Sequence, residues 1–129
     1  MDAKQMNSVS LAYLGDAVYE LYIRDYLIRH GNIQAGELHK RAIQFVTAKA
    51  QARIVQEWLK DGTLSEEEER VVKRGRNAKS GAAPKHTPVQ AYRYSTGFES
   101  LLGYLHVSEE HERAQQLMEK AVQYIESEL

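Results

Sequence analysis

One short carboxylate, Asp16, lies in the middle of a helix-length apolar segment. The segment runs from Leu11 to Leu21, and the apolar side chains in and around it cover almost every direction of a helix. A helix that is apolar nearly all round is expected to be buried, and Asp has a poor propensity for helix interiors. An ionised carboxylate in such a place has to be paired, protonated or bound to a metal. The pattern therefore singles out Asp16 as a candidate metal ligand.

Glu99 is the second candidate, because glycines mark both helices on which these acids are expected. Gly15 directly precedes Asp16, while Gly97 and Gly103 share an expected helix with Glu99. A glycine inside a helix costs about 1 kcal/mol relative to alanine, and close approach of another backbone is the usual reason for one. We expect Gly15 and Gly97 to mark a tight crossing at which Asp16 and Glu99 face each other. Facing carboxylates repel unless a cation lies between them, and Mg²⁺ prefers oxygen ligands.

The elements that must position these acids all read as helices. No segment alternates with period two over the length of a strand, and cap residues fall at the expected boundaries. Residues 1–129 are therefore expected to form a single all-α domain. The expected helices run from about Ser8 to His30, from Gln34 to Phe45, from a Thr47 cap to Asp61, from a Ser65 cap to Arg76, from a Thr87 cap with Pro88 first to His106, and from a Ser108 cap through Ile125.

A basic segment separates the two acids. Between Arg70 and Phe98 there is no Asp or Glu, whereas the rest of the chain holds ten of the 17 basic residues and all 18 acidic ones, a net charge of −8. Such a separation of basic from acidic residues along the chain indicates a polyanionic partner. The alternative is a solvated basic surface on an acidic protein. The segment contains a loop rich in small residues, Gly and Pro, and its basic side chains are Arg70, Lys73, Arg74, Arg76, Lys79, Lys85 and Arg93, with His86 beside them.

Composition excludes several classes of protein. The chain has no cysteine, so it can have neither disulfides nor thiolate metal sites. Its five histidines lack the spacing of a zinc site, and its first residues lack the pattern of a signal peptide. Arg24 and Asp25 interrupt the longest apolar segment, so we expect no membrane association and a cytoplasmic location.

Four stretches in the same order resemble the ribonuclease III family. The sequence 11–18, LAYLGDAV, is similar to the family's signature helix, and 36–40, GELHK, to its G-E-L-[ST]-K segment. Lys79-Ser80-Gly81 resembles the family's K-S-G loop, and 98–103, FESLLG, its F-E-A-L-[IL]-G helix. We expect no double-stranded-RNA-binding domain to follow, and the chain most resembles the Mini-ribonuclease III subfamily, which is associated with maturing precursors of 23S ribosomal RNA.

The resemblance implies Mg²⁺-dependent endonucleolytic hydrolysis of double-stranded RNA by a homodimer, with Mn²⁺ as a substitute metal. Asp16 and Glu99 fall on the family's metal-binding acids, and the metal would activate a water as nucleophile. Excess apolar surface on the first helix suits a C₂ dimer. A ribosomal protein on the substrate could help to position the RNA. The residues expected to bind RNA are Arg74, Arg76, Lys79, Ser80, Lys85, His86 and Arg93.

The sequence also departs from the family. Relatives carry two more carboxylates in the site, where this chain has Ala12 and Thr96. We therefore expect weaker Mg²⁺ binding to the RNA-free protein, with Thr96 and Glu20 as candidates for contacts around the metal rather than to it. Glu20 could instead pair with a basic residue of the core or of the dimer partner. Two alternatives remain open: a catalytically silent module that binds double-stranded RNA, and a helical dimerisation or scaffold protein.

Overall fold

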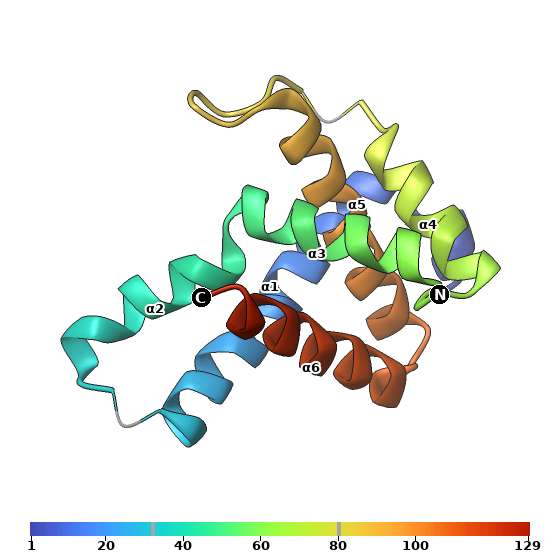
Figure 1. Cartoon of the computed structure of the whole chain (residues 1–129). Coiled ribbons are helices and arrows are strands. Elements are labelled where there is room, and N and C mark those ends of the chain that lie inside the picture. Colours follow the sequence, from blue (N-terminus) through green and yellow to red (C-terminus); the bar gives the residue numbers. More distant parts are fainter. Residues whose placement is uncertain (32, 80) are drawn as a thin grey trace.

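The computed structural model describes residues 1–31, 33–79 and 81–129, and the elements in this part of the chain are all helical. This agrees with the all-α prediction. Figure 1 shows the helices in chain order, with the loop between α4 and α5 extending from one end of the molecule. The elements are η1 (Ala3–Gln5), α1 (Ser8–His30), η2 (Ala35–Glu37), α2 (Leu38–Val46), α3 (Ala48–Asp61), α4 (Glu66–Arg76), α5 (Val89–Val107) and α6 (His111–Ser127).

Side-chain caps define several helix starts. Asn7 accepts from the backbone of Val9 at the start of α1, and Thr47 accepts from Ala50 in α3. Ser65 and Glu68 form the reciprocal capping box that their spacing predicts. These bonds satisfy backbone N–H groups that have no partner within the helix.

Two predicted helix starts were wrong. Helix α5 begins at Val89 with Pro88 as its cap, one residue later than expected, and without a side-chain cap from Thr87. Helix α6 begins at His111, and Ser108 ends α5 instead of starting α6. The chain turns between these helices through Glu109, whose φ of 58° lies in the left-handed region.

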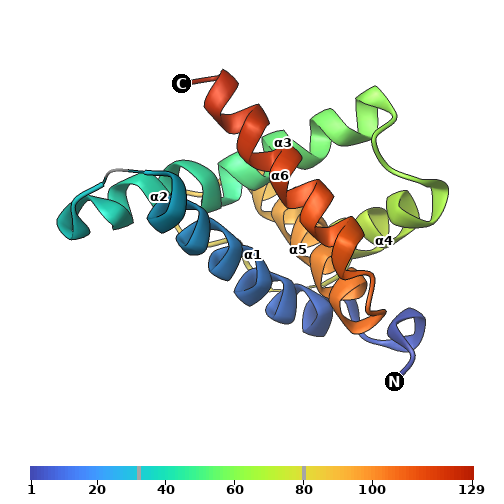
Figure 2. The same cartoon turned by 90° about the horizontal axis from the view of Figure 1, so that it is seen from below.

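Helix α5, and not α1, is the central buried helix. It packs against α1, α3 and α4, and Figure 2 shows it between α1 and α4 with α6 across it. Within residues 95–105 every side chain except that of Glu99 is buried. The sequence-based expectation that α1 is buried all round was therefore wrong for the single chain, because one side of α1 faces solvent.

Glycines let α5 approach two neighbouring helices. A Cβ on Gly15 would collide with the backbone of Glu99 and Gly103, and one on Gly103 would collide with the backbone of Leu11. On another side of α5, a Cβ on Gly97 would lie 2.6 Å from the carbonyl oxygen of Val72 in α4. The tight crossing of α1 and α5 is confirmed, but Gly103 is the partner of Gly15, and Gly97 serves the contact with α4.

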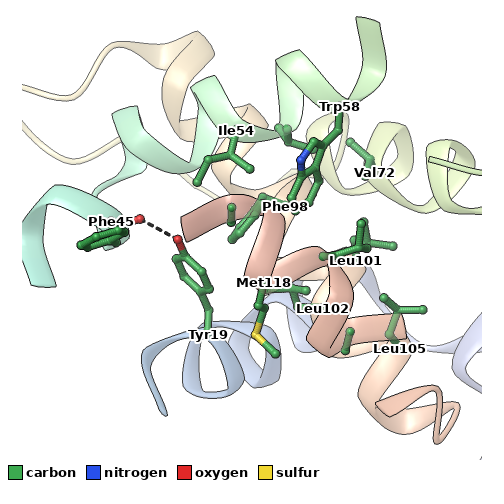
Figure 3. Packing of buried hydrophobic residues seen from close by; sticks show 14 of the residues in the cluster. Tyr19, Phe45, Ile54, Trp58, Val72, Phe98, Leu101, Leu102, Leu105 and Met118 are labelled. Carbon is green, nitrogen blue, oxygen red and sulfur yellow. Dashed lines mark hydrogen bonds between the residues drawn. The ribbon is translucent and has the colours of Figure 1, made fainter. Parts of the chain in front are cut away.

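The core is centred on aromatic side chains from three helices (Figure 3). The ring of Phe98 lies 4.8 Å from that of Tyr19, edge to face, and 5.6 Å from that of Trp58. The hydroxyl of Tyr19 donates a 3.0 Å hydrogen bond to the carbonyl of Phe45 at the end of α2. Phe98 directly precedes Glu99, so this packing fixes the part of α5 that carries the acid. No helix among the described residues is long and apolar enough to cross a bilayer.

Candidate active site

Asp16 on α1 and Glu99 on α5 come together at the crossing of their helices. Gly15 allows the backbone of Glu99 to lie against α1 one residue before Asp16. Asp16 is exposed to solvent, contrary to the expectation that it is buried, whereas Glu99 is mostly enclosed. The pair therefore lies at the edge of the helical core, where one acid can be reached from outside.

The electrostatic state of Glu99 follows from this setting. Burial, repulsion by the charge of Asp16 and hydrogen bonding to Asp16 together raise the pKa of Glu99 to about 8. A more distant contribution comes from the charge of Glu20. Near neutral pH without a cation, the carboxyl of Glu99 is therefore mostly protonated. A divalent cation would offset the repulsion between the two acids, which is one of the causes that keep this proton bound.

Gln51, on α3, is a third polar contributor to the site. Its side-chain amide donates to Oε2 of Glu99 at 3.3 Å and to the carbonyl of Val46 at 3.2 Å. The first of these bonds favours the ionised form of Glu99 and lowers its pKa. Gln51 is 2% exposed, and its Oε1 atom is buried without a hydrogen-bond partner in the structure.

The sequence analysis did not identify Gln51, although a signal was present. Gln51 lies three and four residues before Ile54 and Val55, on the apolar side of α3 that faces the core. A polar side chain at a core-facing helix position needs a hydrogen-bond partner. That periodicity could have identified Gln51, but not its partner.

The two residues considered for contacts around a metal have other partners. Glu20 accepts a 3.3 Å hydrogen bond from Arg24, an exposed residue on its own helix, and not from a basic residue of the core. Thr96 is 5% exposed, and its hydroxyl donates to the carbonyl of Tyr92 at 3.1 Å. Ala12 is also buried.

The donor set is that of a two-carboxylate site. Among the described residues, no group of three or more His, Asp or Glu side chains is placed to hold a metal ion. Asp16 and Glu99 supply carboxylate oxygens, which suit Mg²⁺ because it keeps several of its waters. Burial and, after it, repulsion by Asp16 raise the pKa of Glu99, so a positive charge between the acids would favour its ionised form. These residues fit a hydrated Mg²⁺ ion.

A basic groove adjoins the site along α5. It has a volume of about 760 Å³, lies between the α4–α5 loop and the start of α5, and is lined in part by Lys79, Tyr92 and Arg93. Tyr92 precedes Glu99 by seven residues, which places it on the same side of α5 about 10 Å along the axis. A second hollow of about 270 Å³ shares Arg93 and adds Arg76. The guanidinium of Arg76 lies over the ring of Tyr94, 5.6 Å from its centroid.

The other predicted RNA-binding residues are placed differently. Arg74 bonds to the segment before and at the start of α1, donating to the hydroxyl of Ser8 and to two backbone carbonyls. Lys85 and His86 are exposed in the loop, where His86 has a φ of 71°. Ser80 lies outside the described residues. The basic groove thus brings together Lys79 and Arg93, with Arg76 in the adjoining hollow, whereas Arg74 holds the start of the chain.

The exposed side of α1 carries several large apolar side chains. Tyr13, Leu21 and Ile28 are 86%, 71% and 68% exposed, and their spacing of eight and seven residues places them on one side of the helix. Beside Ile28, a groove of about 380 Å³ between α1 and α2 is lined mainly by apolar side chains. Large apolar side chains gathered on one side of a helix are typical of an interaction surface.

Comparison with known proteins gives concordant results. A model of the ribonuclease III domain matches residues 9–110. Mini-ribonuclease 3 of Enterococcus faecalis is 51% identical over 117 residues, covering 91% of this chain and 89% of that protein. Mini-ribonuclease 3 of Streptococcus pneumoniae is 44% identical over 98% of both chains. The crystal structure of a protein from Fusobacterium nucleatum is similar with a TM-score of 0.82 at 30% identity, covering 99% of this chain and 98% of that one.

Proposed function

Because the chain belongs to the ribonuclease III family, we propose that it is an Mg²⁺-dependent endoribonuclease that cleaves double-stranded RNA and matures precursors of 23S ribosomal RNA in the cytoplasm. The observation that carries this proposal is the meeting of Asp16 and Glu99 at the glycine crossing of α1 and α5. Two mutually repelling carboxylates beside a basic groove are suited to a cation that contacts a phosphodiester.

Asp16 and Glu99 would hold the Mg²⁺ ion, or Mn²⁺ in its place. The bound metal would supply an activated water and stabilise negative charge at the phosphate. Asp16 is reachable from solvent, so it suits the approach of substrate, while Glu99 is held by its surroundings. With only two carboxylates, we expect weak metal binding to the RNA-free protein, and phosphate oxygens of the RNA would complete the donor set.

Double-stranded RNA would be bound through its backbone. A-form duplexes are recognised mostly by shape, phosphates and 2′-hydroxyls. Lys79 and Arg93 line the basic groove at the start of α5, the helix that carries Glu99, and Arg76 lines the adjoining hollow. Lys85 and His86 at the exposed part of the loop extend this surface. We expect RNA affinity to fall steeply with salt, because each phosphate contact releases counterions.

A homodimer would place one active site on each strand of the duplex. The two strands are antiparallel, so a C₂ dimer matches their local twofold symmetry. The exposed apolar residues Tyr13, Leu21 and Ile28 on α1 support this side as the dimer surface. A ribosomal protein bound to the precursor could present the RNA to such a dimer.

The Asp16→Asn variant tests the proposed activity. It removes a metal-binding charge while keeping the size of an exposed side chain, so the fold should be retained. We expect Mg²⁺-dependent cleavage of a duplex RNA to fall at least about 1,000-fold, with RNA binding at low salt unchanged. Asp25→Asn, an exposed aspartate paired with Arg29 on the same helix, is the matched control and should cleave normally.

Three results would contradict the proposal. If the wild-type protein binds duplex RNA but does not cut it in the presence of any divalent cation, the chain is a binding module. If it binds no RNA even at low salt, only a role as a helical scaffold remains. Equal cleavage by the Asp16→Asn variant and the wild type would remove Asp16 from the site.

A further inference from the structure

We propose that Gln51 is a positioning residue that holds the carboxylate of Glu99 in the orientation required for metal binding. This inference rests on the proposed function, because it assigns a task to a neighbour of the same site. Gln51 is uncharged and is not a metal ligand in this proposal. It acts through Glu99, from a third helix that neither of the two acids occupies.

The hydrogen bonds of Gln51 determine its orientation. Its Nε2 atom lies 3.2 Å from the carbonyl oxygen of Val46 and 3.3 Å from Oε2 of Glu99. The carbonyl of Val46 can only accept, so the NH₂ end of the amide must face it, and the same NH₂ group reaches Oε2 of Glu99. The carbonyl of Val46 belongs to the last turn of α2, where it has no partner within the helix. The amide is therefore anchored at the α2–α3 corner and directs its second N–H at Glu99.

This bond restricts how Glu99 can turn. One carboxylate oxygen accepts from Gln51, and the carboxylate also meets Asp16, the other acid of the site. Partners of this kind orient metal-binding side chains, and their loss typically weakens metal binding about 10- to 100-fold. A site with two carboxylates depends strongly on their orientation, because no further acid compensates for a misplaced one.

The other end of the amide argues against a purely structural role. Oε1 of Gln51 is buried and has no hydrogen-bond partner in the structure, and buried polar atoms without partners cost free energy. The core-facing neighbours Ile54 and Val55 are apolar, so an apolar side chain of similar size would suit this position for packing alone. An N–H group directed at Glu99 accounts for the presence of an amide here.

Tyr19→Phe provides a matched control for Gln51→Met. The hydroxyl of Tyr19 donates to the carbonyl of Phe45 (Figure 3), one residue before the carbonyl that Gln51 binds. Each substitution removes one hydrogen bond to the end of α2 and keeps the bulk of the side chain. Only Gln51→Met also removes the donor to Glu99. Comparing the two variants separates an effect on the corner from an effect on the site.

The experiment measures Mn²⁺ binding to the RNA-free protein, from the electron paramagnetic resonance signal of free Mn²⁺, alongside cleavage kinetics. Both variants are first shown to be folded by circular dichroism and thermal melting. We expect Gln51→Met to weaken Mn²⁺ binding about tenfold and to lower kcat at subsaturating Mg²⁺, with KM for RNA unchanged. Tyr19→Phe should match the wild type in Mn²⁺ binding, in kcat and in KM for RNA. In a Glu99→Gln background, Gln51→Met should weaken Mn²⁺ binding no further.

Three results would overturn the proposal: equal Mn²⁺ binding by the two variants, a further loss of Mn²⁺ binding in the Glu99→Gln background, or no Asp16-dependent Mn²⁺ binding by the wild type. Mn²⁺ binding needs no substrate, so the test is independent of the cleavage assay. If the wild-type protein binds Mn²⁺ through Asp16 but cuts no RNA, the proposed function fails, while the comparison of Gln51→Met with Tyr19→Phe still decides the role of Gln51.

Discussion

At the scale of single residues, the two acids of the site differ in environment although they meet. Asp16 is exposed on a helix that faces solvent on one side, whereas Glu99 is enclosed on the central helix. The enclosed acid is the one whose pKa rises, to about 8, while its bond from Gln51 acts in the opposite direction. The site without metal therefore holds a proton that the unfolded chain would release well below neutral pH.

This proton makes the stability of the metal-free protein dependent on pH. The pKa of Glu99 is about 8 in the fold against 4.5 for an ordinary glutamate, so between these values the folded state binds more protons than the unfolded state. Stability contributed by this group is present below about pH 4.5 and decreases as pH rises toward 8, by at most about 1.4 kcal/mol per pH unit. Melting in the presence of a chelator should therefore give a lower Tm at pH 8 than at pH 6.

The Glu99→Gln variant is the control for this dependence, since a neutral amide cannot titrate. Its Tm in chelator should change less between pH 6 and pH 8 than that of the wild type. An equal change in Tm between pH 6 and pH 8 for the two proteins would show that the proton belongs to another group. Adding Mg²⁺ to the wild type should reduce the difference between the two pH values, because a cation removes the repulsion between the acids.

At the scale of the elements, local patterns predicted most helices and missed what packing decides. The Ser65 and Glu68 box appeared as their spacing predicts, because a cap is made within four residues. Ser108 has the residue type of a cap but ends α5, because the chain first turns through Glu109 to lay α6 across the bundle. The direction of α6 depends on its packing against the other helices, and a local sequence pattern does not specify it.

The glycine crossing was predicted in kind but not in detail. Gly97 and Gly103 are six residues apart, a rotation that leaves them about 120° from each other around the helix. Only the surrounding helices show that Gly103 faces α1 while Gly97 faces α4. The burial of α1 was overestimated for a related reason: an apolar side chain can face its own core or a second molecule, and the sequence pattern is the same.

Gly15→Ala should disrupt both the fold and the site. The new Cβ would lie against the backbone of Glu99, which cannot move aside as a flexible side chain could. We expect a loss of about 3 kcal/mol or more in the free energy of unfolding, measured by urea denaturation, and loss of cleavage under conditions where the variant is still folded. Gly36→Ala is the matched control, because a Cβ there meets no atom within 4 Å. Wild-type stability of Gly15→Ala would disprove the tight crossing.

At the scale of the whole molecule, two surfaces have different characters. The α4–α5 loop extends from one end of the molecule (Figure 1), and together with the start of α5 it presents basic side chains. The open side of α1 presents Tyr13, Leu21 and Ile28. A basic groove suits a polyanion, and an apolar helix side suits another protein surface. Separate surfaces for substrate and for a second subunit would allow both to be engaged at once.

Leu21→Glu tests the second of these surfaces. A charge among the exposed apolar side chains of α1 should disfavour their burial in the proposed dimer, so we expect the variant to elute as a monomer and to melt at a lower temperature than the wild type. Light scattering after size exclusion gives the mass. Gln115→Glu adds the same charge to the exposed side of α6 and should leave the mass unchanged. A monomeric wild type, or a dimeric Leu21→Glu variant, would contradict this surface.

The crossing of α1 and α5 also bears on how the protein is made. Asp16 leaves the ribosome early, but its partner Glu99 and the crossing residue Gly103 follow more than 80 residues later in a chain of 129. A nascent chain that ends before Glu99 lacks the second acid, so it has no paired carboxylates. The two-acid site can therefore assemble only after α5 has been made, and shorter nascent chains lack it beside the ribosomal RNA of the particle that makes them.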